Sequence, residues 1–181
     1  MKFGIGQSTA RVEDRRLLIG AGRYSDDIAP GQGLHVAFLR APYAHAHLLK
    51  IDLEAARQID GVYLVATQAD LDADHIGDVL CQYRPPLIDG GKMQLVSKPA
   101  MVRGINRHAG DIVAMVVADR QETAVSAIEL IAAEFEPMPA VTDIYEAMKG
   151  GAPQLYDCYP NNIAFEWGAG KLDETEIAMN A

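Results

Sequence analysis

The chain has 181 residues, of which 49% are hydrophobic and 23% charged, and its formal net charge is −9. This composition is ordinary for a globular protein and provides enough apolar surface for one core. Basic residues are not clustered, which argues against a nucleic-acid or anionic-membrane partner, and the longest apolar run, residues 112–118, is far too short to cross a bilayer. The opening MKFGIGQS lacks an apolar signal region. The two cysteines, Cys81 and Cys158, lie far apart in sequence and are expected to be free thiols of a cytoplasmic protein.

Residues 1–33 are rich in glycine and charge and show neither helical nor strand periodicity. We therefore expect an extended arm that lies across another surface. Each of the G-x-G triplets, 20–22 and 31–33, fails to follow an apolar strand, so turn glycines are favoured over a nucleotide-binding loop. Asp26 and Asp27 are expected to meet solvent or cap backbone groups rather than act in catalysis or bind a divalent metal.

Three apolar, β-prone stretches follow the arm. We predict strands in them, at residues 34–40, 45–53 and 62–66. The second stretch contains His45 and His47, which a strand would direct to one face. A metal site needs further ligands that the neighbouring sequence does not offer, so packing or an interface strand is favoured over a two-histidine site.

Two short helices alternate with these strands. Residues 53–58 indicate a helix with Asp52 at its N-cap. Residues 67–73 indicate a second helix, in which the side chains of Thr67 and Asp70 form a capping box.

The stretch 74–100 contains several prolines and glycines and is predicted to be a long surface loop, a kind of segment that often carries function or binds a partner. It contains Cys81, whose only cationic neighbour is Arg84, which favours an inert thiol over a redox-active one. Cys158 is expected to be buried or packed. The two cysteines lie outside any CxxC pattern and are predicted to be free thiols.

The clearest pattern begins at residue 111. IVAMVVA at 112–118 is a continuous apolar run, typical of a strand buried on both faces. A helix should follow over 120–132, capped by Asp119 with Glu122 in the reciprocal position. One apolar stripe on this helix is formed by Ala124, Ala127, Ile128 and Ile131.

Residues 133–137 return as a strand in which Glu134 and Glu136 should face solvent or a subunit. Strand, helix and strand of this length predict a crossover unit with parallel strands. Residues 143–151 indicate a further short helix and 161–170 a further strand. The fold class is therefore mixed α/β, with a mixed sheet and short helices on one side of it.

The remaining polar residues favour structural roles. His108 and Asp111 flank a turn and are expected to form a structural pair. Four arginines should form ion pairs with this acidic chain rather than bind substrate: Arg15, Arg16, Arg23 and Arg40. No residue is nominated as catalytic, cofactor-binding or metal-binding.

The start of the large subunit of molybdenum hydroxylases resembles three stretches of this chain: RVEDRRLLIGAGRYSDDI (11–28), LHVAFLRAPYAHAHLLKID (34–52) and GVYLVATQADL (61–71). The family includes xanthine dehydrogenase, aldehyde oxidase and aerobic carbon monoxide dehydrogenase, and the last of these branches is the most similar. Residues 102–148 and 150–170 resemble the second half of the same domain, the α/β hammerhead. Where the family reads S-P-Y-A-H-A-R, this chain has Ala41 for the serine and His47 for the arginine, so the contact which that arginine makes in the family does not carry over to this chain.

The resemblance implies a division into an arm at 1–33, a hammerhead domain at 34–170 and the start of a following, helical segment at 171–181. It implies that the complete protein is an oxidoreductase that hydroxylates an aldehyde, an aromatic heterocycle or carbon monoxide with oxygen from water. A molybdopterin-type molybdenum cofactor would lie on the large subunit, with iron–sulfur clusters and FAD on partner subunits.

The family's cofactor-binding loop, G-G-G-F-G, and its glutamate base do not occur in these residues. We therefore expect a piece of a longer subunit that binds no cofactor alone and serves assembly. Its expected partners are the rest of the large subunit, the iron–sulfur and flavin subunits and a second copy of itself. Candidate interface residues are Arg15, Tyr24, Arg40, Tyr43 and His45. The alternative hypothesis is a stand-alone, non-catalytic binding or assembly module.

Overall fold

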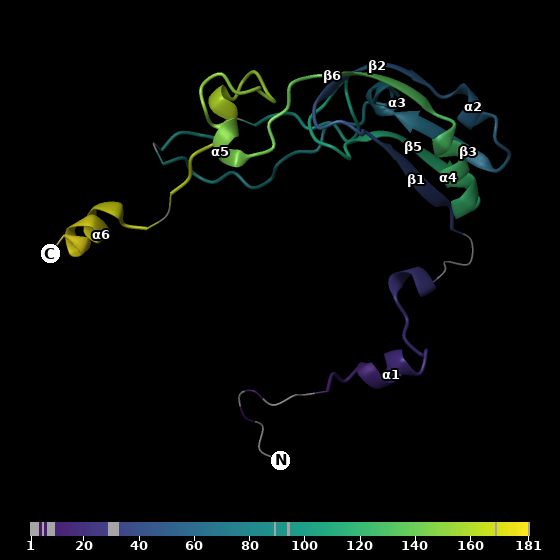
Figure 1. Ribbon diagram of the computed structural model, residues 1–181, viewed down its shortest axis with the longest axis horizontal. Coiled ribbons are helices and arrows are strands. Elements are labelled where there is room, and N and C mark those ends of the chain that lie inside the picture. The colour runs from purple at the N-terminus through teal and green to yellow at the C-terminus, as the bar shows by residue number, and fades with distance from the viewer. Residues whose placement is uncertain are drawn as a thin grey trace. The chain divides into compact units, whose positions relative to one another are not determined.

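The computed structural model describes residues 4, 6, 10–28, 33–88, 90–93, 95–168 and 170–180, without the side chains of Asp26, Leu172 and Asp173. The chain divides into two compact units, residues 1–33 and 34–181 (Figure 1). Part of the predicted arm, including most of the 31–33 glycine triplet, lies outside the described residues.

The first unit contains two short helical segments, so the prediction of an arm without helix is wrong at both places. These segments are α1, Asp14–Leu18, and the 3-10 helix η1, Ser25–Asp27. Arginine and leucine are good helix formers, which explains α1 without any tertiary contact, and α1 buries no residue. A side-chain oxygen of Asp27 accepts a hydrogen bond from the Tyr24 N–H at 2.8 Å, as expected of a carboxylate that caps backbone.

The second unit is built from two three-stranded antiparallel sheets. Sheet A has the order β1, β5, β3, and sheet B the order β4, β2, β6. Their strands are β1 His35–Arg40, β2 Ala46–Asp52, β3 Val62–Thr67, β4 Ile105–Asn106, β5 Ile112–Ala118 and β6 Ala132–Pro137. The five strands predicted up to residue 137 are confirmed, whereas the two-residue β4 was not predicted.

The predicted parallel crossover is wrong. Helix α4, Gln121–Glu129, does connect β5 to β6, but β5 belongs to sheet A and β6 to sheet B. The reason lies in β6, where Glu134 and Glu136 are exposed on either side of the half-buried Phe135. That alternation is typical of an antiparallel strand with one wet face, whereas parallel strands are buried on both faces.

The remaining predicted helices are confirmed with shorter bounds. They are α2 Glu54–Arg57, α3 Gln68–Ala73, α5 Ile144–Ala147 and, in the tail, α6 Leu172–Met179. At α2 the Glu54 N–H donates to Asp52 at 3.0 Å, and at α3 the Thr67 N–H donates to Asp70 at 2.7 Å. The capping box of Thr67 and Asp70 is confirmed. The prediction of Asp52 as the N-cap of α2 is wrong, because the N-cap is Leu53 and Asp52 accepts its hydrogen bond from the position before it.

Asp119 does not cap α4, contrary to prediction, because the N-cap is Arg120 and no side-chain capping bond forms there. Asp119 lies instead against Gly61, and its N–H donates to the Gly61 carbonyl at 2.9 Å. Gly61 has a φ of +89°, and an added Cβ would come within 2.6 Å of an Asp119 carboxylate oxygen. The turn before β3 therefore needs a glycine.

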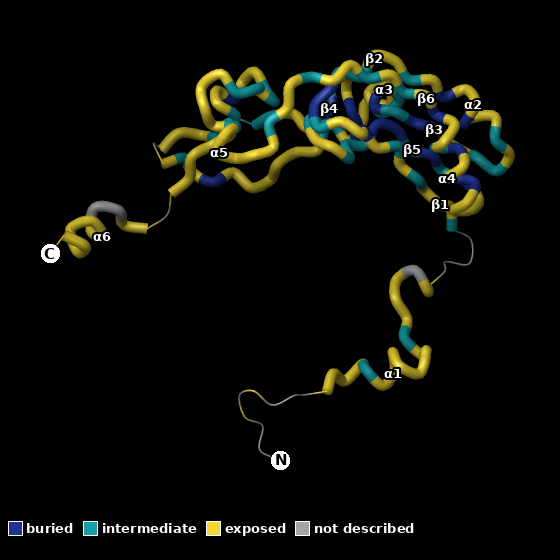
Figure 2. Tube along the Cα trace, in the orientation of Figure 1, coloured by how far each residue is buried: buried dark blue, intermediate teal, exposed yellow. Residues whose placement is uncertain are grey.

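The main core lies between sheet A and the helices α2 and α4, as the buried segments in Figure 2 show. Ala124 and Ala127 of α4 are fully buried and pack near the equally buried Ala114 and Val116 of β5. Small side chains on both surfaces bring the helix close to the sheet, which confirms the predicted apolar stripe. A second cluster, Ala41, Val102 and Val113, packs against Leu48 and Phe135 of sheet B.

The predicted strand at 161–170 is wrong for the described residues. The chain instead forms the 3-10 helix η2, Pro160–Asn162, in which Asn161 and Asn162 have positive φ angles of 53° and 58°. Asparagine tolerates this left-handed conformation better than other side chains, and a strand cannot contain it.

Candidate interaction site

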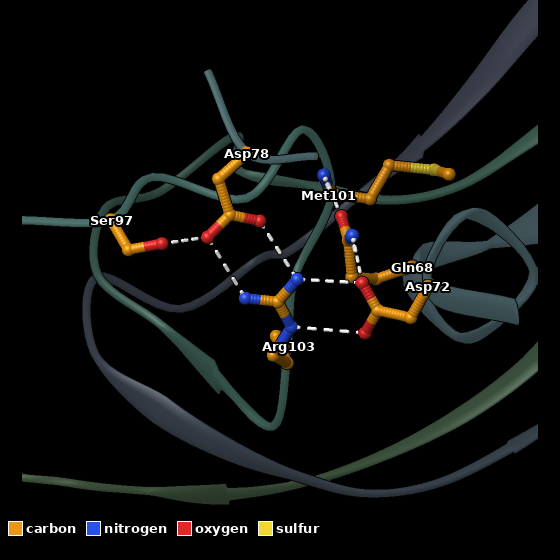
Figure 3. A network of polar contacts seen from close by, with 6 residues as sticks. All are labelled: Gln68, Asp72, Asp78, Ser97, Met101 and Arg103. Carbon is orange, nitrogen blue, oxygen red and sulfur yellow. Dashed lines mark hydrogen bonds and ion pairs between the residues drawn. The ribbon is translucent and has the colours of Figure 1, made fainter. Parts of the chain in front are cut away.

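Arg103 fastens the base of the long loop to helix α3 (Figure 3). Its Nε and Nη2 donate to the two carboxylate oxygens of Asp72 at 3.0 and 2.6 Å. Its Nη1 and Nη2 donate to those of Asp78 at 3.0 and 2.8 Å. The planar guanidinium is suited to such paired bonds, and here it joins an α3 carboxylate to one in the loop.

Two further side chains complete this clasp, which we define as Gln68, Asp72, Asp78, Ser97 and Arg103. The Ser97 hydroxyl donates to Asp78, from the far end of the loop. The buried Gln68 donates to Asp72 at 2.8 Å and accepts from the Met101 N–H at 2.8 Å. The clasp thus joins both ends of the loop to α3.

The charges in the clasp stabilise one another. Hydrogen bonds from Arg103, and then from Gln68, hold the pKa of Asp72 below its ordinary value. The two carboxylates raise the pKa of Arg103 in turn. The clasp residues are well exposed apart from Gln68 and Asp78, so water screens these ion pairs. These ion pairs therefore fix the position of the loop base against α3 more than they stabilise the folded domain.

The loop beyond the clasp is closed by two isolated backbone bridges, Val79 with Lys98 and Pro86 with Lys92. As predicted, no helix or longer strand occurs in the described residues of 74–100. The loop therefore leaves the body of the domain at residue 79 and returns at residue 98, and the backbone bridge between these two residues holds its ends together.

A second set of contacts fastens the C-terminal segment. Arg107 donates from Nε to the Leu155 carbonyl at 2.8 Å, and its guanidinium lies 4.4 Å from the centre of the Tyr156 ring. Asn162 accepts from the Leu155 N–H at 2.9 Å and donates to the carbonyls of Ala147 and Pro153. The positive φ of Asn162 places its side chain within this turn.

The loop and the tail then run side by side. The Ile88 N–H donates to the Glu166 carbonyl at 3.2 Å, and the Ile88 side chain lies against Gly168. Tyr159 is 9% exposed, and burial raises the pKa of its hydroxyl. The composite surface formed by 79–98 and 163–168 exposes large apolar side chains: Leu80, Tyr83, Ile88, Phe165 and Trp167.

Sequence reasoning missed the clasp and the tail fastening. It identified 74–100 as a possible partner-binding loop, but it nominated neither Arg103 nor Arg107. The available signal was weak: Arg103 follows an acidic stretch, ADLDADHIGD, whose carboxylates need a cation. Sequence spacing alone could not select which of them Arg103 would contact.

His45 and His47 form no metal site in the described structure. His45 lies just before β2 and is 5% exposed, with Nδ1 3.1 Å from the Pro139 carbonyl oxygen. His47 lies in β2 opposite Glu136. Across the described residues, no group of three or more His, Cys, Asp or Glu side chains gathers to hold a metal ion.

None of the other candidate interface residues belongs to the clasp. Arg40 donates to the Gly110 carbonyl at 2.8 Å and lies 5.8 Å from the Phe38 ring centre, rather than pairing with an acid as predicted. Tyr43 is 40% exposed, and its ring packs at 5.7 Å from that of Phe135. Arg15 and Tyr24 belong to the first unit and are exposed. Their interface roles stay predictions.

Two smaller predictions have mixed outcomes. His108 and Asp111 do form a pair, with Nδ1 3.7 Å from a carboxylate oxygen. Cys81 and Cys158 are both free thiols, as predicted. Both are also exposed, so the prediction that Cys158 is buried is wrong. Cys158 lies in a turn just before the 3-10 helix η2, where its neighbour Tyr159 takes the buried position.

In the part of the chain that is described, no helix is long and apolar enough to cross a membrane.

Fold and contacts together define a mixed α/β domain whose loop and tail are held in place by side chains. Residues 19–139 match the family model described as "Aldehyde oxidase and xanthine dehydrogenase, a/b hammerhead domain". The chain belongs to this family, so the resemblance read from the sequence is confirmed.

Relatives agree with this assignment. The chain is 34% identical to the nicotine 6-hydroxylase large subunit of Paenarthrobacter nicotinovorans, over 98% of this chain and 21% of the relative. It is also 34% identical to the carbon monoxide dehydrogenase large chain of Afipia carboxidovorans, over 93% and 19%. The solved quinoline 2-oxidoreductase of Pseudomonas putida 86 matches with a TM-score of 0.65 at 39% identity, over 84% of this chain and 19% of that one. The chain thus spans about a fifth of the length of these relatives.

The family implies a molybdenum cofactor. The described residues bring no set of three potential metal ligands together. The one buried side-chain atom left without a partner among them, Oδ1 of Asn106, belongs to a fully buried residue of β4. We therefore derive no chemical step from these residues.

Proposed function

We propose that this chain is the hammerhead domain of the large, molybdenum-binding subunit of a molybdenum hydroxylase, nearest to the carbon monoxide dehydrogenase-like branch. This proposal rests on the 34% identity to two large subunits, that of nicotine 6-hydroxylase over 98% of this chain and that of carbon monoxide dehydrogenase over 93% of it. In the complete protein the reaction would be hydroxylation of an aldehyde, an aromatic heterocycle or carbon monoxide, with water as the oxygen source. Iron–sulfur and flavin subunits would carry the electrons away.

The role of this domain within such a protein is structural. Its described polar contacts hold the loop at 74–100 and the C-terminal segment against the body of the domain (Figure 3), which supports a role in assembly. The partners we propose are the rest of the large subunit, the iron–sulfur and flavin subunits and a second copy, in the cytoplasm. Arg15, Tyr24, Arg40, Tyr43 and His45 are the proposed contacts, of which the nearly buried His45 could act only by shaping the start of β2.

The nucleotide sequence downstream of the codon for Ala181 provides the first test. An in-frame continuation that encodes loops of the G-G-x-F-G kind supports the large-subunit proposal. A stop codon, with no neighbouring gene for the remaining domains, supports the alternative of a stand-alone assembly module.

Metal analysis of the purified chain provides a second test. A pterin cofactor requires many converging donors from several loops, so the chain alone should hold no molybdenum and oxidise no substrate. Molybdenum bound in stoichiometric amount would refute the proposal that this domain serves assembly alone.

A further inference from the structure

The composite surface of the loop and tail has the chemistry of a protein-binding surface. Tyr83 is 70% exposed, Trp167 is 54% exposed, and Ile88 beside the tail is 65% exposed. Tyrosine, tryptophan and arginine are the residue types that carry most binding energy at protein interfaces. The clasp and the Arg107 contacts hold both segments in place before any partner arrives, which lowers the entropy cost of binding.

The charge of this surface is opposite to that of the chain. Residues 79–98 and 163–168 together contain three basic residues and two acids, a net charge of +1, whereas the whole chain has −9. Arg84 and Lys92 line one hollow of about 490 Å³, together with Pro85, Pro86 and Met93. Neither cation has an ion pair within the described residues, and both are exposed. The hollow is therefore suited to carboxylates carried on a protein surface.

The same chain carries such carboxylates on the outer strand of sheet B. Glu134 and Glu136 are exposed on β6, whose second edge has no strand partner among the described residues. Residues two apart on a strand are separated by roughly 6.5 Å and point to one face. The pair thus presents two carboxylates side by side, to match Arg84 and Lys92.

We propose that the loop–tail surface of one copy binds the β6 carboxylates of a second copy. Carboxylates of Glu134 and Glu136 would enter the hollow lined by Arg84 and Lys92, and Tyr83 and Trp167 would bury apolar area around it. This contact joins two different surfaces, so it builds open chains rather than a closed dimer. It concerns the chain by itself and does not depend on redox chemistry in a longer protein.

Light scattering coupled to size-exclusion chromatography tests this contact on the full 181-residue chain. The average mass should rise with concentration at low salt without levelling at the dimer, and it should fall towards the monomer in ~0.5 M NaCl because salt screens exposed charges. Arg84→Glu with Lys92→Glu should weaken association by roughly tenfold or more, since two attractive pairs become repulsive. Glu134→Lys with Glu136→Lys should do the same.

A mixture of the two charge-reversed variants provides the decisive experiment. Each variant has like charges on both surfaces and should be monomeric alone, but the two together restore opposite charges and should associate. Arg57→Glu with Arg120→Glu changes the net charge as much as the Arg84 and Lys92 reversal does, at two exposed positions, one in α2 and one at the N-cap of α4, and should associate as the unmodified chain does. Tyr83→Ser should weaken association, whereas Tyr63→Ser, of similar exposure at 68%, should not.

Far-UV circular dichroism establishes that each variant is folded before its mass is interpreted. If the unmodified chain stays monomeric at every concentration, the proposal is overturned, because no second copy then binds the loop–tail surface. Association that survives both reversals, or a mixture that stays monomeric, would overturn it equally.

Discussion

Replacing Asn106 by aspartate should make the stability of this domain fall as pH rises. Asn106 is fully buried in β4, and its Nδ2 donates to the carbonyl oxygens of Tyr43 at 2.6 Å and His108 at 3.3 Å. A protonated aspartic acid can still donate one hydrogen bond to the Tyr43 carbonyl. An ionised one cannot, and it places a buried charge beside carbonyl oxygens.

The size of the effect follows from proton linkage. Burial raises the folded-state pKa of the new carboxyl above its unfolded value of about 3.9, so the folded state holds a proton that the unfolded state releases. Stability is then highest below the unfolded pKa and falls by about 1.4 kcal/mol for each pH unit up to the folded pKa. Buried carboxyls reach a pKa of about 8–9. With a folded pKa in that range, the loss between about pH 5 and about pH 7 is roughly 2.7 kcal/mol, a large share of a domain stability of about 5–15 kcal/mol.

Urea unfolding at several pH values, followed by far-UV circular dichroism, measures this loss as the difference between Asn106→Asp and the unmodified chain. Trp167 is a poor probe because it is 54% exposed in the tail. Asn106→Ala is the control: it leaves the Tyr43 carbonyl without its donor and should cost about 1–3 kcal/mol at every pH. A difference for Asn106→Asp that stays flat across this pH range would refute the buried, donor-requiring position assigned to Asn106.

Three further outcomes are expected. Arg103→Gln should release the base of the loop and speed chymotryptic cleavage within 79–98 by about tenfold, whereas Arg57→Gln, with a similarly exposed ion pair, should leave that rate unchanged. Thr67→Ala should lower the free energy of unfolding by about 1 kcal/mol in urea titrations. The hydrogen bond from the Thr67 N–H lowers the pKa of Asp70 in the folded state. The stabilisation that the Asp70 carboxylate provides should therefore be present above its unfolded-state pKa and be lost as pH falls through its folded-state pKa. Ala124→Leu should overpack the helix against the sheet and cost about 1–3 kcal/mol by the same assay.

The elements that sequence analysis located correctly are those whose cause is local. The apolar run at β5, the Ala124 and Ala127 stripe and the Thr67–Asp70 cap each depend on residues within one turn or one strand. The positions of β5 and α4 and the capping of α3 could therefore be read from spacing. The family, too, could be read from ordered stretches of sequence, and residues 19–139 bear it out.

The features that were missed depend on residues far apart in sequence. Arg103 contacts carboxylates 31 and 25 residues away, and Arg107 reaches a carbonyl 48 residues away. Nothing in the local pattern selects those partners from the many acids of this chain. The left-handed pair Asn161 and Asn162 was missed for a related reason, since the apolar residues that follow suggested a strand and the turn chemistry of asparagine was given too little weight.

The error at the crossover shows how this domain comes to have two sheets. A strand, a nine-residue helix and a strand can return to one sheet only if the second strand tolerates burial on both faces. Glu134 and Glu136 forbid that, because an unpaired carboxylate in the interior costs more than β-pairing returns. The chain therefore passes from sheet A to sheet B at β6, and the same carboxylates that prevent a parallel sheet remain on an outer strand where a partner can reach them.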